Sequence, residues 1–219
     1  MAQNAHLKMY LSNAIDLAEP PVILGVTGGI GSGKSAMSDL LVQRGAARFD
    51  ADIAGHEVLG HDEVKTALTA RWGAAIVGDD GNLIRSIIGE IVFSDPSELQ
   101  FLESVSHPAI KRMMLHSVSE ARSTSALTAL VIDAALLLEK AWSECCDLVV
   151  FVDCEEEIRW QRCESRNWSR EQFLLRESTQ LPVETKREQS DVVIDNTGSL
   201  EELDDQVRNL WNILAQVHA

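Results

Sequence analysis

The segment from residue 22 to residue 43 constrains the fold more than any other part of this chain. An apolar run over residues 22–26 leads into a glycine-rich turn, after which apolar residues recur at helical spacing over residues 34–43. The turn, residues 28–35, reads G-G-I-G-S-G-K-S and fits the pattern G-x-x-x-x-G-K-S. A strand, a glycine turn and a helix in this order predict an α/β fold built around a phosphate-binding loop, or P-loop.

The chemistry of this turn suits a nucleoside triphosphate. Glycines let backbone N–H groups converge on phosphate oxygens without Cβ clashes, and the following helix directs the positive end of its dipole at the same charge. We expect Lys34 to reach the β- and γ-phosphates and the Ser35 hydroxyl to ligate Mg²⁺. The alternative, a glycine turn that merely closes a strand–helix junction, is disfavoured because motif and context are both present. The predicted nucleotide contacts are Gly29, Ile30, Gly31, Ser32, Gly33, Lys34, Ser35 and Ala36.

Four further apolar runs predict the other strands of a parallel sheet. Continuous Val, Ile and Leu without alternation is typical of strands that are covered on both faces by crossover helices. The runs lie at residues 47–49, 127–132, 148–152 and 192–194. The predicted fold class is therefore α/β, a three-layer P-loop nucleoside-triphosphate fold with a five-stranded parallel sheet, a helical substrate-binding insertion and a helical lid.

The chain length of 219 residues suits one α/β domain that carries insertions better than two independent domains. Pro20 and Pro21 end a polar stretch and mark the start of the domain. The long gaps between strands are too long for simple loops. The predicted parts are an N-terminal extension (1–20), a core (21–52, 125–154 and 190–219) that closes with an amphipathic helix over 200–217, a helical acceptor-binding insertion (53–124), and a lid formed by an Arg-rich helical pair (155–189).

The charge and cysteine content of the chain bear on which kinds of partner it can bind. Nineteen basic against thirty-four acidic residues give a formal net charge of -15, which disfavours nucleic acid and anionic membranes as partners. The four cysteines show no metal-ligand spacing, and no run approaches the roughly 18 apolar residues of a membrane span. No secretory signal is recognisable in the first twenty residues. The chain is expected to be cytoplasmic, with no obligate protein partner.

Carboxylates follow two of the predicted strands. Asp50 and Asp52 stand at the end of the second strand, where open α/β sheets bind their ligands. One of them could orient an acceptor hydroxyl and take its proton, or either could simply cap the next helix. Asp133 follows the third strand and occupies the usual place of an acid that holds the Mg²⁺ shell.

Four arginines gather between residues 158 and 170 of this acidic chain: Arg159, Arg162, Arg166 and Arg170. Guanidinium groups here could close over a triphosphate and stabilise charge on the transferring phosphoryl group. The alternative is a solvated helix face on which Arg159 and Arg162 pair with the acidic residues 155–157. We assign that alternative to most of the arginines but not to all of them.

Several short motifs stand along the chain in a recognisable order. T-G-G-I-G-S-G-K-S occupies residues 27–35, D-A-D occupies residues 50–52, and S-D-V-V-I-D-N-T-G occupies residues 190–198. In this combination the chain resembles the dephospho-CoA kinase family from about residue 22 onward. Further matches to that family are Arg85 before a helix, a helix-opening His107-Pro108, an altered D-x-P-L-L-F-E at residues 133–139, and a lid arginine at Arg166.

The resemblance implies transfer of a phosphoryl group from ATP, with Mg²⁺, to the ribose 3′-hydroxyl of dephospho-CoA, the final step of coenzyme A synthesis. It assigns Asp52 as base or orienter of the hydroxyl and Asn196 as a neighbour of the ATP adenine. The insertion would hold the pantetheine and adenine ends of dephospho-CoA. The implied catalytic residues are Asp52, Lys34 and Arg166, and the implied substrate contacts are Asp52, Arg85 and His107.

The chain departs from the family pattern at three positions. Ala36 stands where a second hydroxyl residue is usual, which removes one possible contact to the α-phosphate. Ala135 and Leu138 replace a usual proline and phenylalanine beside the acceptor pocket. The rival interpretations are another P-loop small-molecule kinase, with a nucleoside, nucleotide or sugar acceptor, and a GTP-dependent switch. The chain has no N-K-x-D string for guanine, which disfavours the switch.

Overall fold

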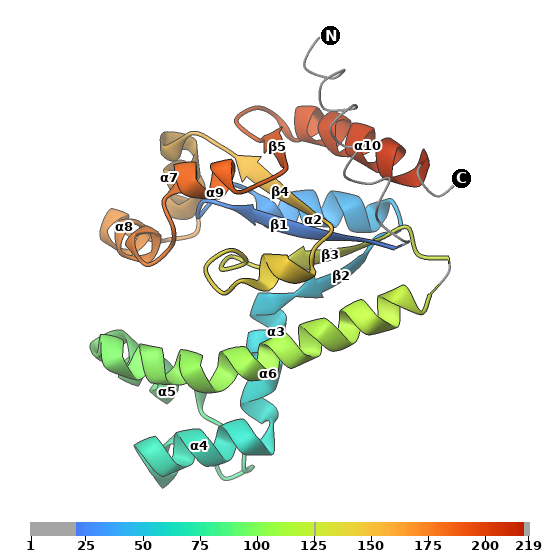
Figure 1. Ribbon diagram of the computed structural model, residues 1–219. Helices are drawn as coiled ribbons and strands as arrows, with labels where there is room; N and C mark the ends of the chain where they lie inside the picture. Colours follow the sequence, from blue (N-terminus) through green and yellow to red (C-terminus); the bar gives the residue numbers. More distant parts are fainter. Residues whose placement is uncertain (1–20, 125, 217–219) are drawn as a thin grey trace. The chain divides into compact units, whose positions relative to one another are not determined.

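The computed structural model describes residues 21–124 and 126–216 (Figure 1). These residues group into two compact units, residues 21–49 with 117–216 and the segment Asp50–His116. The predicted extension and the last residue of the predicted final helix, Val217, lie outside the described residues. No helix in the described part of the chain has both the length and the apolar run that a membrane span requires.

The first unit is built on a five-stranded sheet in the order β2-β3-β1-β4-β5. The central strand β1 runs parallel to both of its neighbours, β3 and β4, and β4 runs parallel to β5. Every residue of β1 is buried, as expected for a strand with helices on both faces. The predicted five-stranded parallel sheet is confirmed. The strands are β1 (Val22–Gly28), β2 (Ala47–Asp50), β3 (Ala129–Asp133), β4 (Leu148–Asp153) and β5 (Val192–Asp195).

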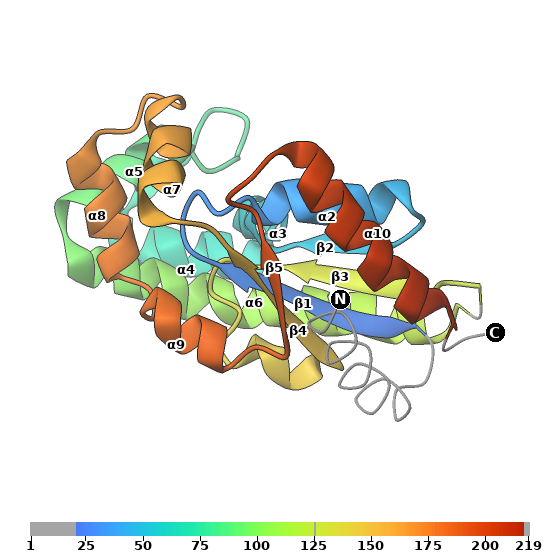
Figure 2. The ribbon, with the colours of Figure 1, turned by 90° about the horizontal axis from the view of Figure 1, so that it is seen from above.

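Two helices of the first unit, α2 (Lys34–Gln43) and α10 (Leu200–Gln216), lie side by side against the sheet (Figure 2). Both helices bury one apolar face in the same core cluster as the strands. The buried side chains are Met37, Leu40 and Leu41 from α2, and Leu203, Val207, Leu210 and Leu214 from α10. Packing of this kind holds the turn between β1 and α2 in a fixed place on the sheet.

The segment between β4 and β5 contains three helices, α7 (Glu156–Glu164), α8 (Arg170–Ser178) and α9 (Val183–Glu188). The prediction of a helical pair is therefore wrong. Ser169 and Gln172 form a capping box that begins α8. Pro182 stands directly before α9. A proline disfavours helical geometry at the residue that precedes it, so the helical path is interrupted there and a third helix begins after Pro182.

The second unit is helical, with short 3₁₀ turns and one isolated antiparallel bridge between Val77 and Leu83. Its buried apolar side chains include Val58, Val64, Leu68 and Ile88. The elements are α3 (Ala51–Glu57), η1 (Val58–Gly60), α4 (Asp62–Trp72), η2 (Ala74–Ile76), α5 (Arg85–Ser94) and α6 (Pro96–Arg122). The last turns of α6 belong to the first unit, which also contains the short 3₁₀ turn η3 (Trp142–Cys145).

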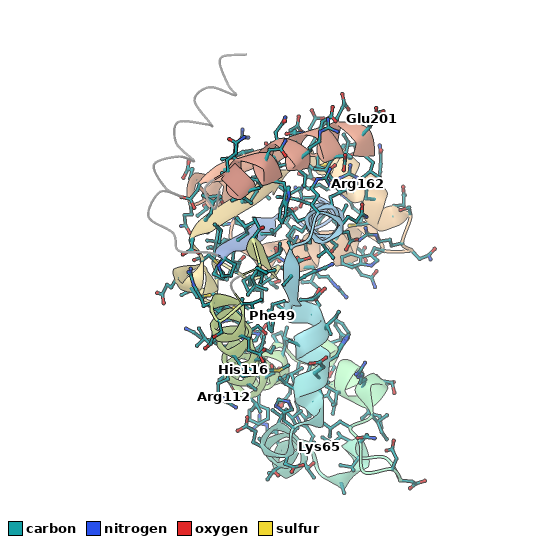
Figure 3. The ribbon with its side chains drawn as sticks, turned by 90° about the vertical axis from the view of Figure 1, so that its right-hand side faces the viewer. Phe49, Lys65, Arg112, His116, Arg162 and Glu201 are labelled. Atoms are coloured by element: carbon teal, nitrogen blue, oxygen red, sulfur yellow. The ribbon has the colours of Figure 1, made fainter. Side chains whose placement is uncertain are left out.

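Polar contacts join α4 to α6 within the second unit. Glu98 accepts hydrogen bonds from Arg71 Nη2 at 2.7 Å and from Trp72 Nε1 at 2.7 Å. The bonds from Arg71 and then from Trp72 hold the pKa of Glu98 below its usual range. Arg112 of α6, which Figure 3 labels, also pairs with Glu63 of α4. The Arg112–Glu63 pair is exposed and contributes little to stability, whereas Glu98 is largely shielded from water.

The expectation that His107-Pro108 opens a helix is wrong, because Pro108 lies inside α6. Proline favours the first turn of a helix, and in α6 that position belongs to Pro96. An internal proline removes one backbone hydrogen bond and costs about 3 kcal/mol. The helix continues beyond it because the next turns bury Ala109, Ile110 and Met114.

One buried ion pair joins α9 to the segment after β3. Lys186, only 1% exposed, donates to Glu139 Oε1 at 2.8 Å, to the carbonyl of Ala135 at 3.1 Å and to Gln180 Oε1 at 2.9 Å. Glu139 Oε1 also accepts the backbone N–H of Leu181 at 2.9 Å. All three donors of the ammonium group therefore have acceptors. The pair thus joins the segment that follows Asp133 to α9 and to the residues just before it.

Replacing Lys186 with Met tests this link. The variant leaves Glu139 buried without its counter-charge, and we expect a loss of about 3–5 kcal/mol in the free energy of unfolding, measured by urea denaturation. The matched control is Lys186→Met combined with Glu139→Leu, which removes both charges and should recover most of the loss. A single variant within about 0.5 kcal/mol of the wild type would contradict the assignment.

Candidate nucleotide site

The turn between β1 and α2 has a backbone that only glycine adopts readily. Gly31 has φ 75° and Gly33 has φ 96°, both in the left-handed region. A Cβ at Gly33 would overlap the carboxamide nitrogen of Asn196, and one at Gly31 would overlap the carbonyl of Arg159. Both glycines are therefore required by backbone geometry and by close approach of neighbouring elements.

Neighbouring side chains hold the carbonyl groups of this loop. Arg162 Nη1 donates to the carbonyl of Ser32 at 3.2 Å, and the Asn196 carboxamide donates to the same oxygen at 2.7 Å. Arg159 Nη1 donates to the carbonyl of Ile30 at 3.2 Å. Lys34 Nζ donates to the carbonyls of Gly28 and Gly29 at 3.2 and 3.1 Å. The loop's acceptors are thus bonded to the protein itself.

Several N–H groups of the same loop have no acceptor in the described part of the protein, whereas the Ser32 N–H donates to the carbonyl of Gly29. Within the described residues, the backbone N–H groups of Gly31, Gly33 and Ser35 donate no hydrogen bond, and the first turn of α2 carries no side-chain cap. Unused N–H groups at a helix N-terminus attract an anion, and the helix dipole adds to that attraction. The loop is therefore suited to phosphate.

Arg159 and Arg162 make more contacts with the protein around the phosphate loop than the sequence indicated. Arg159 is 4% exposed, pairs with Glu177 of α8, and also donates through Nε to the carbonyl of Cys154 at 3.2 Å. Arg162, which Figure 3 labels, donates through Nη2 to the carbonyl of Asn196 at 2.8 Å. The alternative of a solvated face paired with residues 155–157 is wrong for both of these arginines.

Arg170 does pair with one of these acidic residues, Glu156, at 2.6 Å, but it is half-buried and lies over the ring of Trp160 rather than on a solvated face. Arg166, the predicted phosphate clamp, is exposed, and its guanidinium forms no hydrogen bond or ion pair with the described residues. Burial raises the pKa of the neighbouring Cys163 thiol, while the charge of Arg166 opposes that shift. Arg166 is therefore available to a ligand, and its role stays a prediction.

Asp133 ends β3 and is nearly buried. It stands beside Val26 of β1 in the register of the sheet, just before the loop begins. Its Oδ2 accepts a hydrogen bond from Arg48 Nη2 at 2.6 Å, and Ser35 lies exposed in the first turn of α2. A carboxylate and a hydroxyl are hard oxygen ligands, and Mg²⁺ in nucleotide sites uses few protein ligands beside phosphates and waters. The donor set therefore suits Mg²⁺.

The predicted acceptor-side residues come from the second unit. Asp50 caps α3, since its Oδ1 accepts the N–H groups of Asp52 and Ile53 at 3.0 Å each. The capping alternative thus falls on Asp50, and the exposed Asp52 carboxylate accepts no hydrogen bond from the described residues. Arg85 is exposed in the first turn of α5, and His107 is half-buried in α6. Their roles stay predictions.

Comparison with known proteins adds to this geometry. The dephospho-CoA kinase family model matches residues 22–202. This chain belongs to that family. A dephospho-CoA kinase of Frankia casuarinae is 37% identical over 87% of this chain and 82% of its own length. One of Geobacter sulfurreducens is 36% identical over 86% of this chain and 96% of its own length.

Solved structures agree in fold. A Thermus thermophilus protein is 35% identical, with a TM-score of 0.73 over 90% of this chain and 98% of its own. Dephospho-CoA kinase from Campylobacter jejuni has a TM-score of 0.70 at 22% identity, over 89% of this chain and 97% of its own, which supports the fold alone. The family is thus established by sequence and its fold by structure.

The contact between Gly33 and Asn196 generates a prediction. Gly33→Ala adds a Cβ where the Asn196 carboxamide lies and strains a positive φ, which costs about 1–3 kcal/mol. We expect the ATP dissociation constant to rise by about tenfold or more, measured by calorimetry. Gly81→Ala is the matched control, because Gly81 also has a positive φ but no atom near its Cβ, and it lies outside the loop. Equal ATP affinity in the two variants would contradict the prediction.

Proposed function

We propose that this protein transfers the γ-phosphoryl group of ATP to the ribose 3′-hydroxyl of dephospho-CoA and so forms coenzyme A. The observation that carries the proposal is membership of the dephospho-CoA kinase family over residues 22–202, together with an intact phosphate loop in which the N–H groups of Gly31, Gly33 and Ser35 are unused by the described residues. A cytoplasmic location remains a prediction.

The donor half of the reaction is assigned to the loop and its neighbours. The N–H groups of the loop bind the phosphate oxygens, and Lys34, whose ammonium already lies against the loop carbonyls, moves toward the β- and γ-phosphates. Bound Mg²⁺, held near Ser35 and Asp133, would neutralise charge that develops on the phosphate oxygens. Arg166 is proposed as a further clamp, since its exposed guanidinium has no partner of its own among the described residues.

The acceptor half is assigned to Asp52, with Arg85 and His107 as acceptor contacts. In the transfer, the 3′-oxygen forms a bond to the γ-phosphorus while the bond from that phosphorus to the β–γ bridging oxygen breaks, and ADP leaves. The hydroxyl proton passes to the carboxylate of Asp52. Support for this choice comes from the cap of α3: the carboxylate of Asp50 forms the cap, and the carboxylate of Asp52 does not take part in it.

A comparison of acceptors tests the proposal. Purified protein with ATP and Mg²⁺ is offered dephospho-CoA, a nucleoside, a nucleoside monophosphate and a sugar in a coupled assay of ADP release. We expect fast turnover with dephospho-CoA and only slow background with the others. Robust turnover of another acceptor, with none of dephospho-CoA, would refute the proposal in favour of a different small-molecule kinase.

Asp52→Asn tests the acceptor half separately. The amide cannot accept the proton, so we expect kcat to fall by roughly 10²-fold to 10⁴-fold while ATP affinity stays near the wild-type value. Asp50→Asn is the matched control, because an asparagine oxygen still caps α3, and its kcat should stay within a few-fold of wild type. A near-normal kcat for Asp52→Asn would exclude Asp52 as the base.

A further inference from the structure

Arg48 divides its guanidinium between two carboxylates of the first unit. It lies in β2, beside β3 in the sheet, and donates through Nη2 to Asp133 Oδ2 at 2.6 Å. Its Nη1 donates to Asp39 Oδ1 of α2 at 2.8 Å. Arg48 thereby connects the end of the strand that carries Asp133 with the helix that follows the phosphate loop.

The two contacts differ in burial. The side chains of Arg48 and Asp133 are 20% and 9% exposed, whereas Asp39 is 61% exposed. A pair with one partner in water is weak and screened by salt. A short, charge-assisted bond to a nearly buried carboxylate is much stronger. The bond to Asp133 therefore decides where the guanidinium lies.

Asp133 has a rotatable carboxylate, and its orientation matters if it faces a metal shell. Carboxylates near metal ions are commonly held by outer hydrogen-bonding partners, and loss of such a partner typically weakens metal affinity by about 10-fold to 100-fold. Arg48 has the place and geometry of such a partner. Its two terminal nitrogens serve different carboxylates, whereas a lysine would keep the charge but offer a single donor nitrogen in place of two.

We propose that Arg48 is a positioning residue that fixes the orientation of Asp133 toward the metal side of the nucleotide site. The inference rests on the proposed function, in which Asp133 supports Mg²⁺. Two effects oppose each other: the guanidinium charge repels a cation, and the fixed carboxylate attracts it. We expect the fixed carboxylate to outweigh the repulsion, and the Mg²⁺ dependence of ATP affinity decides between the two effects.

The test compares ATP binding with and without Mg²⁺ by calorimetry. The ratio of the dissociation constant in chelator to that in excess Mg²⁺ measures the protein's contribution to metal binding, and it does not depend on turnover. We expect Arg48→Gln to reduce this ratio by about tenfold while ATP affinity in chelator is unchanged. Arg48→Lys should reduce the ratio by a smaller factor, and it serves also if the Gln variant does not fold.

Asp39→Ala is the matched control, since it removes the acceptor of only the exposed bond of Arg48 and should keep the wild-type ratio. An unchanged or larger ratio in a folded Arg48 variant would overturn the inference, a larger one because repulsion would then dominate. An Asp133→Asn variant with a wild-type ratio would overturn the metal role of Asp133 and this inference with it. Failure of the acceptor assay alone would instead refute the choice of acceptor.

Discussion

The backbone of the phosphate loop must have its carbonyl groups bonded to the protein if its N–H groups are to bind an anion. Arg159 and Arg162 from α7, together with Asn196 after β5, meet that need by donating to the carbonyls of Ile30 and Ser32. The strand order makes this possible, because β4 and β5 follow β1 on one side of the sheet and deliver α7 and Asn196 to the loop. The strand order of the first unit therefore also holds the phosphate loop in the conformation that exposes its N–H groups.

The same contacts explain how a chain with a net charge of -15 can bind a polyanion. Backbone N–H groups and the helix dipole supply fixed positive potential without adding free charge. Arg159 is balanced by Glu177, and Arg48 by Asp133 and Asp39, so the buried cations are paired before any ligand arrives. Lys34 and Arg166 remain as the cations assigned to the ligand.

The elements that the sequence predicted well are those defined by local pattern. The strand, turn and helix from residue 22 to residue 43 follow from apolar runs and glycines close in the chain, and so do the other strands. Contacts between distant residues left no such signal: Asn196 meets Ser32 across 164 positions, and Arg48 meets Asp133 across 85. For the same reason Pro108 was misassigned, since only burial of the following turns shows that α6 continues through it.

Identification of the phosphorylated product by ³¹P NMR tests directly whether the protein transfers the γ-phosphoryl group to dephospho-CoA. With ATP, Mg²⁺ and dephospho-CoA, we predict one new phosphomonoester resonance, on the ribose 3′-oxygen, for each ADP released. Release of ADP with inorganic phosphate and no new phosphomonoester would contradict this prediction, because the loop would then serve hydrolysis rather than transfer to an acceptor.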